Sequence, residues 1–250
     1  MSTFTSEHDE FAPKIDWERH ESVAVVCWND GENRHNPDTI RLFLNILDDI
    51  EDSPEVRAVV IASKDQKNWS QGIDLDWISA AMADKTRHDE VREFLHSLNR
   101  VYARLLTYPM PVIAAINGHA FGNGAILACA CDFRFMRSDR GFFCFPEVDI
   151  GIPFFPGMMA VMGKAIPGWQ LNQMTLTGRR VTGSELEASH VVEKASVGFD
   201  ALMVDAIDFA KTFDKGRGIF KAIKQRRYKE VLDVFETLDP PAIAKLELRA

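Results

Sequence analysis

The sequence predicts an α/β fold that ends in a helical region. Short runs rich in β-branched residues alternate with amphipathic helical stretches up to about residue 137. Beyond Gly151 the apolar residues follow the period of helices instead. The strand–helix–strand order implies parallel strands joined by right-handed crossovers. A chain of 250 residues is long enough for one large domain, or for a core with a helical appendage.

The spacing of apolar residues defines the elements of the first half. Alternate residues from Val23 to Trp28 should face opposite sides of a strand. Asp38 should cap the first long helix, and a later helix should bury a stripe that runs from Val91 to Leu105. The expected strands lie at 15–20, 22–28, 57–62 and 112–116, and the expected helices at 38–52, 74–83 and 87–107.

The second half starts with a strand at 132–137 and an extended apolar segment at 141–151, which two acids, Glu147 and Asp149, interrupt. Helices are expected at 157–165, 169–176, 183–189, 200–213, 219–235 and 241–248. No long linker or repeat divides the chain. We therefore expect a loose tail at 1–14, a core at 15–195 that holds the active site, and a helical region at 196–250.

Composition excludes several classes of function. The net charge is −8, with 29 Lys and Arg against 37 Asp and Glu, which argues against a nucleic-acid surface. No apolar run is long enough for a membrane span, and the first ten residues are polar rather than a signal peptide. The four cysteines lie in apolar runs and no histidine completes a zinc set, so we expect no metal site. The last three residues are not a peroxisomal signal, which favours a cytoplasmic location.

Residues 111–132 are the stretch that most suggests a function. They form an apolar strand, a turn that contains Gly118, Gly122, Asn123 and Gly124, and an apolar helix of small residues. Free N–H groups at the start of such a helix attract a phosphate, a carboxylate or an oxyanion. Neither nucleotide-binding glycine pattern is present. The pattern alone leaves open an anion site and a purely structural turn.

Two motifs together resemble the crotonase, or enoyl-CoA hydratase/isomerase, family over about residues 23–232. Residues 70–75 (SQGIDL) and 113–124 (IAAINGHAFGNG) are similar to the two glycine loops of that family, in the same order. Residues 35–40, 117–120, 135–141 and 147–151 more narrowly resemble plant-type peroxisomal Δ3,Δ2-enoyl-CoA isomerases. The resemblance implies a spiral of ββα repeats, an acyl-CoA thioester as substrate with no separate cofactor, and a homotrimer or homohexamer.

The resemblance also implies an oxyanion site made by two main-chain groups. The N–H groups of Ile73 and Asn123, one from each glycine loop, would bind the thioester oxygen as charge develops on it. Asn123 stands where the family usually has glycine. Its side chain could crowd the thioester or strain the backbone.

The second catalytic need is a base beside the α-carbon of the acyl chain. Glu147 matches the later of two glutamates that hydratases of the family carry, and Ile126 occupies the position of the earlier one. A lone carboxylate suits proton transfer from C2 to C4, which is double-bond isomerisation. Asp149 is the rival base, because alternate residues of an extended chain face the same way. Hydration, or silent binding of acyl-CoA, is the alternative function.

Other candidate residues follow from the same resemblance. Apolar neighbours should raise the pKa of the Glu147 carboxyl, namely Phe142, Phe143, Phe145, Ile150, Phe154 and Phe155. The expected substrate contacts in the two glycine loops are Gln71, Gly72, Asp74, Gly122, Gly124 and His119. For His119, a hydrogen bond to main chain is an equal alternative. Arg34, His35 and Lys221 are expected near the CoA phosphates, although a solvated basic face also explains Lys221. Region 196–250 should cover the CoA site and support oligomerisation.

Overall fold

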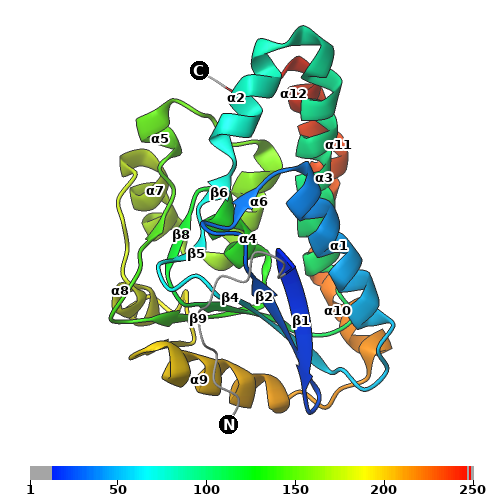
Figure 1. Ribbon diagram of the computed structural model, residues 1–250, viewed down its shortest axis with the longest axis vertical. Coiled ribbons are helices and arrows are strands. Elements are labelled where there is room, and N and C mark those ends of the chain that lie inside the picture. The colour runs from blue at the N-terminus through cyan, green and yellow to red at the C-terminus, as the bar shows by residue number, and fades with distance from the viewer. Residues whose placement is uncertain (1–12, 247, 249–250) are drawn as a thin grey trace.

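The computed structural model describes residues 13–246 and residue 248. Of the predicted tail, residues 1–12 lie outside this range, as do residues 249–250 of the C-terminal tripeptide. The main sheet has the strand order β1-β2-β4-β7-β9-β11, with β1 and β2 antiparallel and the other pairs parallel (Figure 1). Its strands are β1 (Ile15–His20), β2 (Val23–Trp28), β4 (Ala58–Ser63), β7 (Val112–Ile116), β9 (Phe133–Arg137) and β11 (Lys194–Ser196).

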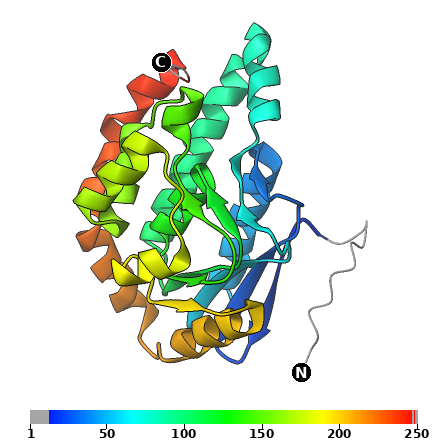
Figure 2. The ribbon, with the colours of Figure 1, turned by 90° about the vertical axis from the view of Figure 1, so that its left-hand side faces the viewer.

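The sheet has a core on each face, as the alternation in β2 predicts. Ala24, Val26 and Trp28 belong to the larger core. The odd-numbered residues of β2, beginning with Val23, face the other side, where α9 (Phe199–Lys211) lies along the sheet (Figures 1 and 2). That second core contains Val23, Val25, Cys27, Ala58, Val60, Ala62, Ile113, Ala115, Phe135, Leu202, Met203, Ala206 and Ala210.

The long helices of the first half follow their predicted positions closely. They are α1 (Pro37–Glu51), α2 (Leu75–Ala83) and α3 (His88–Leu106), and a short 3₁₀ turn at Lys85–Arg87 precedes α3. The stripe predicted on α3 is buried. The predicted cap of α1 is wrong, because Asn36 and not Asp38 accepts the N–H of Thr39, at 3.1 Å, while the Thr39 hydroxyl accepts the N–H of Asn36.

Two small sheets, which apolar spacing did not reveal, bring the glycine loops together. One joins β5 (Asn68–Ser70), β8 (His119–Phe121) and β10 (Phe143–Cys144) in the order β10-β8-β5. The other pairs β3 (Arg34–His35) with β6 (Gly72–Ile73). The helix α4 (Asn123–Ala130) follows β8 directly and lies near the centre of the molecule, beside β6 (Figure 1).

The second half differs from its prediction in three places. The extended segment expected at 141–151 contains a helical turn, α5 (Glu147–Ile150). The single helix expected at 219–235 is two helices that meet at Tyr228. The boundary drawn between residues 195 and 196 falls inside β11, which pairs with β9 in the main sheet. The remaining helices are α6 (Pro156–Ala165), α7 (Gly168–Thr177), α8 (Gly183–Ala188), α10 (Arg217–Arg227), α11 (Lys229–Thr237) and α12 (Asp239–Lys245).

Candidate active site

The site begins at the N-terminus of α4. Gly122 precedes the helix with a φ of +52°, a value that favours glycine. The first intrahelical bond runs from the N–H of Ile126 to the carbonyl of Gly122, at 3.0 Å. The N–H groups of Asn123, Gly124 and Ala125 therefore have no acceptor within the helix. They present positive partial charge at this end of α4.

The first glycine loop lies against this helix end. A Cβ added to Gly72 would come within 2.7 Å of the Phe121 carbonyl oxygen and 2.8 Å of the Asn123 nitrogen, so only glycine permits the approach. Asp74 donates its N–H to the carbonyl of His35, at 2.9 Å. Because N–H groups alternate along a strand, the N–H of Ile73 points away from β3, where this two-stranded sheet has no further strand. The amides of Ile73 and Asn123 thus lie on adjoining segments.

Glu147 lies beside the same helix end. Its side chain is buried, and its Oε1 is 3.1 Å from the position that a Cβ on Gly122 would occupy. Its Oε2 has no hydrogen-bond partner among the described residues. Burial raises the pKa of the Glu147 carboxyl to about 7. A buried carboxyl with a free oxygen and a pKa near neutrality is suited to accept and return a proton.

The neighbours of Glu147 match the sequence prediction in part. Phe143, Phe145 and Phe155 are buried, whereas Ile150 is 48% exposed. The rival base Asp149 is exposed, and its carboxylate lies against Gly178, at the end of α7. The comparison of the two acids assumed an extended chain, but both lie in the helical turn α5, where residues two apart point in different directions. Only Glu147 therefore reaches the N-terminus of α4.

The side chain of Asn123 is held by two buried neighbours. Asn123 has a helical backbone as the first residue of α4 and is not among the residues with positive φ. Tyr102 donates its hydroxyl hydrogen to Asn123 Oδ1, and Asn123 Nδ2 is 2.7 Å from His35 Nδ1. All three side chains are buried. The expected strain of the Asn123 backbone is therefore wrong, whereas the expected crowding of the thioester stays a prediction.

His35 does not lie where a phosphate contact was predicted. Its side chain is fully buried, and burial lowers its pKa to about 3, so the imidazole is neutral. Its partners are Asn123 and, through Nε2 at 3.0 Å, the hydroxyl of Ser70. A neutral ring without solvent contact does not suit a phosphate. Its neighbour Arg34 is partly exposed, pairs with Glu32 at 2.7 Å and stays a candidate phosphate ligand.

The other loop candidates have structural partners of their own. Gln71 donates from Nε2 to Asn68 Oδ1 at 2.6 Å, and Asp74 caps α2 by accepting the N–H of Trp77 at 3.0 Å. Gly124 allows close packing, because a Cβ there would lie 2.5 Å from the Ser70 carbonyl oxygen. Main-chain groups of both loops are left to contact a ligand.

His119 is bound to main chain, which is the alternative that the sequence left open. Its Nδ1 accepts the N–H of Phe142 at 3.2 Å, and its ring packs against Phe121 and Phe142. Burial lowers its pKa, helped by nearby cations that include Lys67. His119 thus lies in β8 with its ring packed against two aromatic neighbours. Its role in substrate binding stays a prediction.

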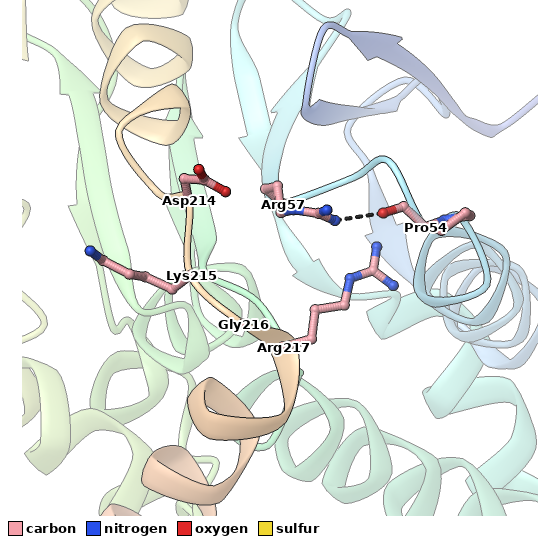
Figure 3. A pocket seen from close by; sticks show the side chains of 6 residues that line it. All are labelled: Pro54, Arg57, Asp214, Lys215, Gly216 and Arg217. Carbon is pink, nitrogen blue, oxygen red and sulfur yellow. Dashed lines mark hydrogen bonds between the residues drawn. The ribbon is translucent and has the colours of Figure 1, made fainter.

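Lys221 lies at the far end of α1 from the loops. Its Nζ is 3.6 Å from Glu51, the last residue of α1, whereas His35 precedes the first, so α1 separates them by roughly 20 Å. A surface hollow lies in the same region (Figure 3). It is lined by Pro54, Arg57, Asp214, Lys215, Gly216 and Arg217. Within this chain, Lys221 and the hollow are both remote from the glycine loops.

The arginines of the hollow join α10 to the turn after α1. Arg57 donates to the carbonyl of Pro54 at 2.5 Å, the bond drawn in Figure 3. Arg217 donates to the carbonyls of Glu51, Ser53 and Val56. These guanidinium groups are therefore occupied by main-chain acceptors.

The C-terminus of α4 carries two cations that sequence reasoning missed. Lys164 of α6 donates to the carbonyls of Cys129, Ala130 and Cys131, at 2.8, 3.3 and 2.6 Å. Arg134 donates to the carbonyls of Ala128 and Cys131. These donors satisfy free carbonyls, and their positive charge complements the helix dipole, whose positive end faces Glu147. Burial lowers the pKa of the Lys164 ammonium to about 7. A lysine inside the apolar stretch of α6 was the available signal.

The described residues contain neither a membrane-spanning helix nor a metal-binding cluster. No helix there combines the length and apolar character that a membrane span needs. Within the same part of the chain, no group of three or more His, Cys, Asp or Glu side chains is arranged to hold a metal ion.

Comparisons with known proteins agree with this geometry. A family model described as enoyl-CoA hydratase/isomerase matches residues 18–237. The chain is 34% identical over 180 residues to enoyl-CoA delta isomerase 2, peroxisomal, of Arabidopsis thaliana, which covers 71% of this chain and 75% of that protein. It is 36% identical over 183 residues to enoyl-CoA delta isomerase 3 of the same plant, covering 71% and 74%.

Solved structures share the fold. The crystal structure of a probable enoyl-CoA hydratase from Mycobacterium tuberculosis superposes with a TM-score of 0.82, over 94% of this chain and 96% of that one. Its sequence identity is 22%, so this similarity shows the architecture alone. The predicted spiral fold is confirmed.

Proposed function

This chain belongs to the enoyl-CoA hydratase/isomerase family, and we propose that it converts 3-enoyl-CoA thioesters to trans-2-enoyl-CoA thioesters. Two relatives that match most of the chain are named as enoyl-CoA delta isomerases. The substrate would be the acyl-CoA itself, with no separate cofactor. This reaction moves one double bond and needs one group that removes a proton and returns it.

Glu147 would act as that group. Its carboxylate takes a proton from C2 of the 3-enoyl thioester, which gives a dienolate, and returns it at C4. The N–H groups of Ile73 and Asn123 bind the thioester oxygen, where the negative charge of the dienolate collects. The N-terminus of α4, whose first N–H groups have no acceptor within the helix, stabilises the same charge. These contacts strengthen as the proton leaves, and they therefore lower the barrier rather than only bind substrate.

The observation that carries this proposal is a single buried carboxylate at the N-terminus of α4. Glu147 lies there with a free oxygen. Ile126, which occupies the position of the first glutamate of the hydratases, is a buried core residue on α4. An isoleucine cannot hold or activate the water molecule that hydration needs, so the position of Ile126 supports isomerisation.

Two assays in deuterated water separate the candidate functions. Isomerisation predicts that trans-3-hexenoyl-CoA becomes the trans-2 isomer with deuterium incorporated, and that Glu147→Gln abolishes this conversion. Hydration predicts 3-hydroxyacyl-CoA from trans-2-hexenoyl-CoA. A silent acyl-CoA-binding protein would bind both thioesters without exchange at the α-carbon. Isomerase activity that survives Glu147→Gln would show that another group is the base.

The two reasons for considering a catalytically silent acyl-CoA-binding protein are also compatible with an isomerase. They are Asn123 as an obstacle in the oxyanion loop and the missing first glutamate. The Asn123 side chain is held by hydrogen bonds to Tyr102 and His35. The missing glutamate is explained equally well by an isomerase.

A further inference from the structure

A buried chain of hydrogen bonds connects the two glycine loops. Tyr102 donates to Asn123 Oδ1, and Asn123 Nδ2 faces His35 Nδ1 at 2.7 Å. His35 Nε2 lies 3.0 Å from Ser70 Oγ, which donates in turn to the carbonyl of Asn33 at 2.8 Å. The side chains of all five residues are buried. These residues come from α3, α4 and the segments that contain β3 and β5.

The direction of each bond follows from the Ser70 hydroxyl, whose single hydrogen is donated to the carbonyl of Asn33. His35 Nε2–H must then donate to Ser70 Oγ, and His35 Nδ1 is an acceptor without a proton. The Asn123 nitrogen therefore donates to Nδ1, and the Asn123 oxygen accepts from Tyr102. This requires a neutral ring, and the burial of His35 keeps it neutral. Every polar group in the chain has a partner, which rigidifies the surrounding structure.

His35 contacts both of the segments that carry the amide donors. Its carbonyl accepts the N–H of Asp74 at 2.9 Å, and in the β3–β6 pair it lies opposite Ile73. Through Ser70, whose hydroxyl accepts the N–H of Gly72 at 3.1 Å, its side chain steadies the residue before Ile73. Through Asn123 it holds the first residue of α4. No other described side chain is bonded to both Ser70 and Asn123.

We propose that His35 is a positioning residue that fixes the Ile73 and Asn123 amides relative to each other, with Asn123 and Tyr102 as its link to α4. This inference rests on the function proposed above, because those amides are its oxyanion donors. A donor displaced by about 1 Å stabilises the developing charge much less, while binding of the rest of the CoA thioester is retained. The side chain that departs from the family's glycine would thus serve to orient the loop.

The chain offers variants that break one contact at a time. His35→Gln retains a donor toward Ser70 but loses the acceptor for Asn123, and His35→Asn does the reverse. Tyr102→Phe removes only the hydroxyl that holds Asn123. The matched control is Tyr108→Phe, which removes a buried hydroxyl that donates to the carbonyl of Leu47, away from both loops.

The first measurement is a steady-state comparison with trans-3-hexenoyl-CoA. We expect kcat to fall about 10- to 100-fold in His35→Gln and in Tyr102→Phe, with KM changed less than about threefold. Tyr108→Phe should retain wild-type kcat. Thermal unfolding of each variant shows whether it is folded at the assay temperature. A kcat within about twofold of wild type in folded His35→Gln and Tyr102→Phe would overturn the proposal.

A double-mutant cycle tests whether His35 acts through Asn123. In Asn123→Gly there is no side chain for His35 to hold. Adding His35→Gln to that variant should therefore lower kcat less than about threefold further, because Gln retains the contact to Ser70. If the double variant loses kcat by the product of the two single-variant factors, His35 and Asn123 act independently and the proposal is wrong.

The third measurement does not depend on isomerase activity. The infrared carbonyl band of bound hexanoyl-CoA, a saturated thioester, moves to lower frequency when two amides donate to its oxygen. We expect this shift in the wild-type protein and the loss of most of it in His35→Gln. If the wild type shows no shift, the proposed oxyanion site itself fails. A wild-type shift that His35→Gln retains in full contradicts only the positioning role.

Discussion

At the scale of single residues, Glu147 owes its chemistry to what surrounds it. Its side chain is buried and its Oε2 has no partner among the described residues, so the loss of hydration outweighs the one main-chain hydrogen bond that favours the charged form. Burial therefore raises the pKa of the carboxyl to about 7. A base with this pKa is stronger than an ordinary glutamate, and about half of it is ionised at pH 7.

The first prediction concerns the pH dependence of activity. Only the carboxylate form of Glu147 can accept a proton, so kcat/KM should fall about tenfold per pH unit below about pH 7. The measurement is kcat/KM for trans-3-hexenoyl-CoA between about pH 5 and about pH 9. Unfolding curves at each pH exclude loss of structure as the cause. A profile that stays flat down to about pH 5 would contradict a raised pKa.

The second prediction concerns stability at the same residue. A carboxyl whose pKa rises from 4.5 to about 7 on folding binds its proton more tightly in the folded state. Its stabilising effect is complete below about pH 4.5 and is lost as the pH rises through about 7. Glu147→Gln, which cannot ionise, should thus be more stable than wild type at about pH 8, by on the order of 3 kcal/mol.

Urea unfolding at two pH values tests this prediction. The advantage of Glu147→Gln should shrink below about 1 kcal/mol at about pH 5, where the wild-type carboxyl is protonated in the folded state. A variant that is less stable than wild type at about pH 8 would show that the carboxylate has a stabilising partner.

Single residues also mark how far the sequence could be interpreted. The glycine loops and Glu147 were found because their chemistry lies in local motifs. The partners of Asn123 were not, since Tyr102 and His35 come from distant segments and no spacing connects them. The preference for Glu147 over Asp149 stays a prediction, and it assumed an extended chain where the structure has a helical turn.

At the scale of elements, α4 is matched to its surroundings at both ends. Its N-terminal amides are free beside Glu147, and its C-terminal carbonyls are bound by Lys164 and Arg134. Most residues between are small and all are buried, so the helix cannot shift without disturbing the core. Fixed position is what an oxyanion site needs, because its donors must not reorganise during the reaction.

The third prediction concerns the cap of α4. Lys164→Met retains most of the side-chain volume but removes the side-chain donor of the Cys129 and Ala130 carbonyls, and it leaves the Cys131 carbonyl with Arg134 alone. We expect a loss of about 1–3 kcal/mol in the free energy of unfolding. Lys229→Met is the matched control, because Lys229 forms an exposed ion pair with Asp233. This substitution should lower the free energy of unfolding by less than about 1 kcal/mol. Equal losses in the two variants, measured by urea unfolding, would contradict the capping role.

Elements were predictable when they were long and periodic. The helices α1 and α3 and the strands β2, β4 and β7 show clear apolar spacing. The strands β3, β8 and β11 were missed, since two or three residues carry no alternation and their partners lie far away in sequence. The strands β3 and β8 build the site, and their contribution could be seen only in the folded chain.

At the scale of the whole molecule, the sheet depends on residues from both ends of the chain. The face formed by alternate residues of β2, β4 and β7 is covered by α9. On the other side, α11 packs on α6, and α12 packs on α3 (Figure 2). The division at residue 195 rested on no linker or repeat, and it cuts β11, which pairs with β9 in the main sheet.

The fourth prediction is that a chain ending at residue 195 does not fold. It lacks α9, so the apolar face that includes Val25, Val60 and Ile113 would be exposed to water. It also cuts β11 short and removes Lys224, whose buried ion pair with Asp132, at 2.7 Å, ties α10 to the end of α4. A carboxylate left buried without its partner is costly, and an apolar face of this size promotes aggregation. We expect no cooperative thermal transition and strong binding of a hydrophobic dye.

Leu202→Ala in the full chain is a milder change in the same interface. It should retain cooperative unfolding and lose about 2–5 kcal/mol in the free energy of unfolding. A soluble 1–195 chain that unfolds cooperatively would show that the core is complete without the helical region.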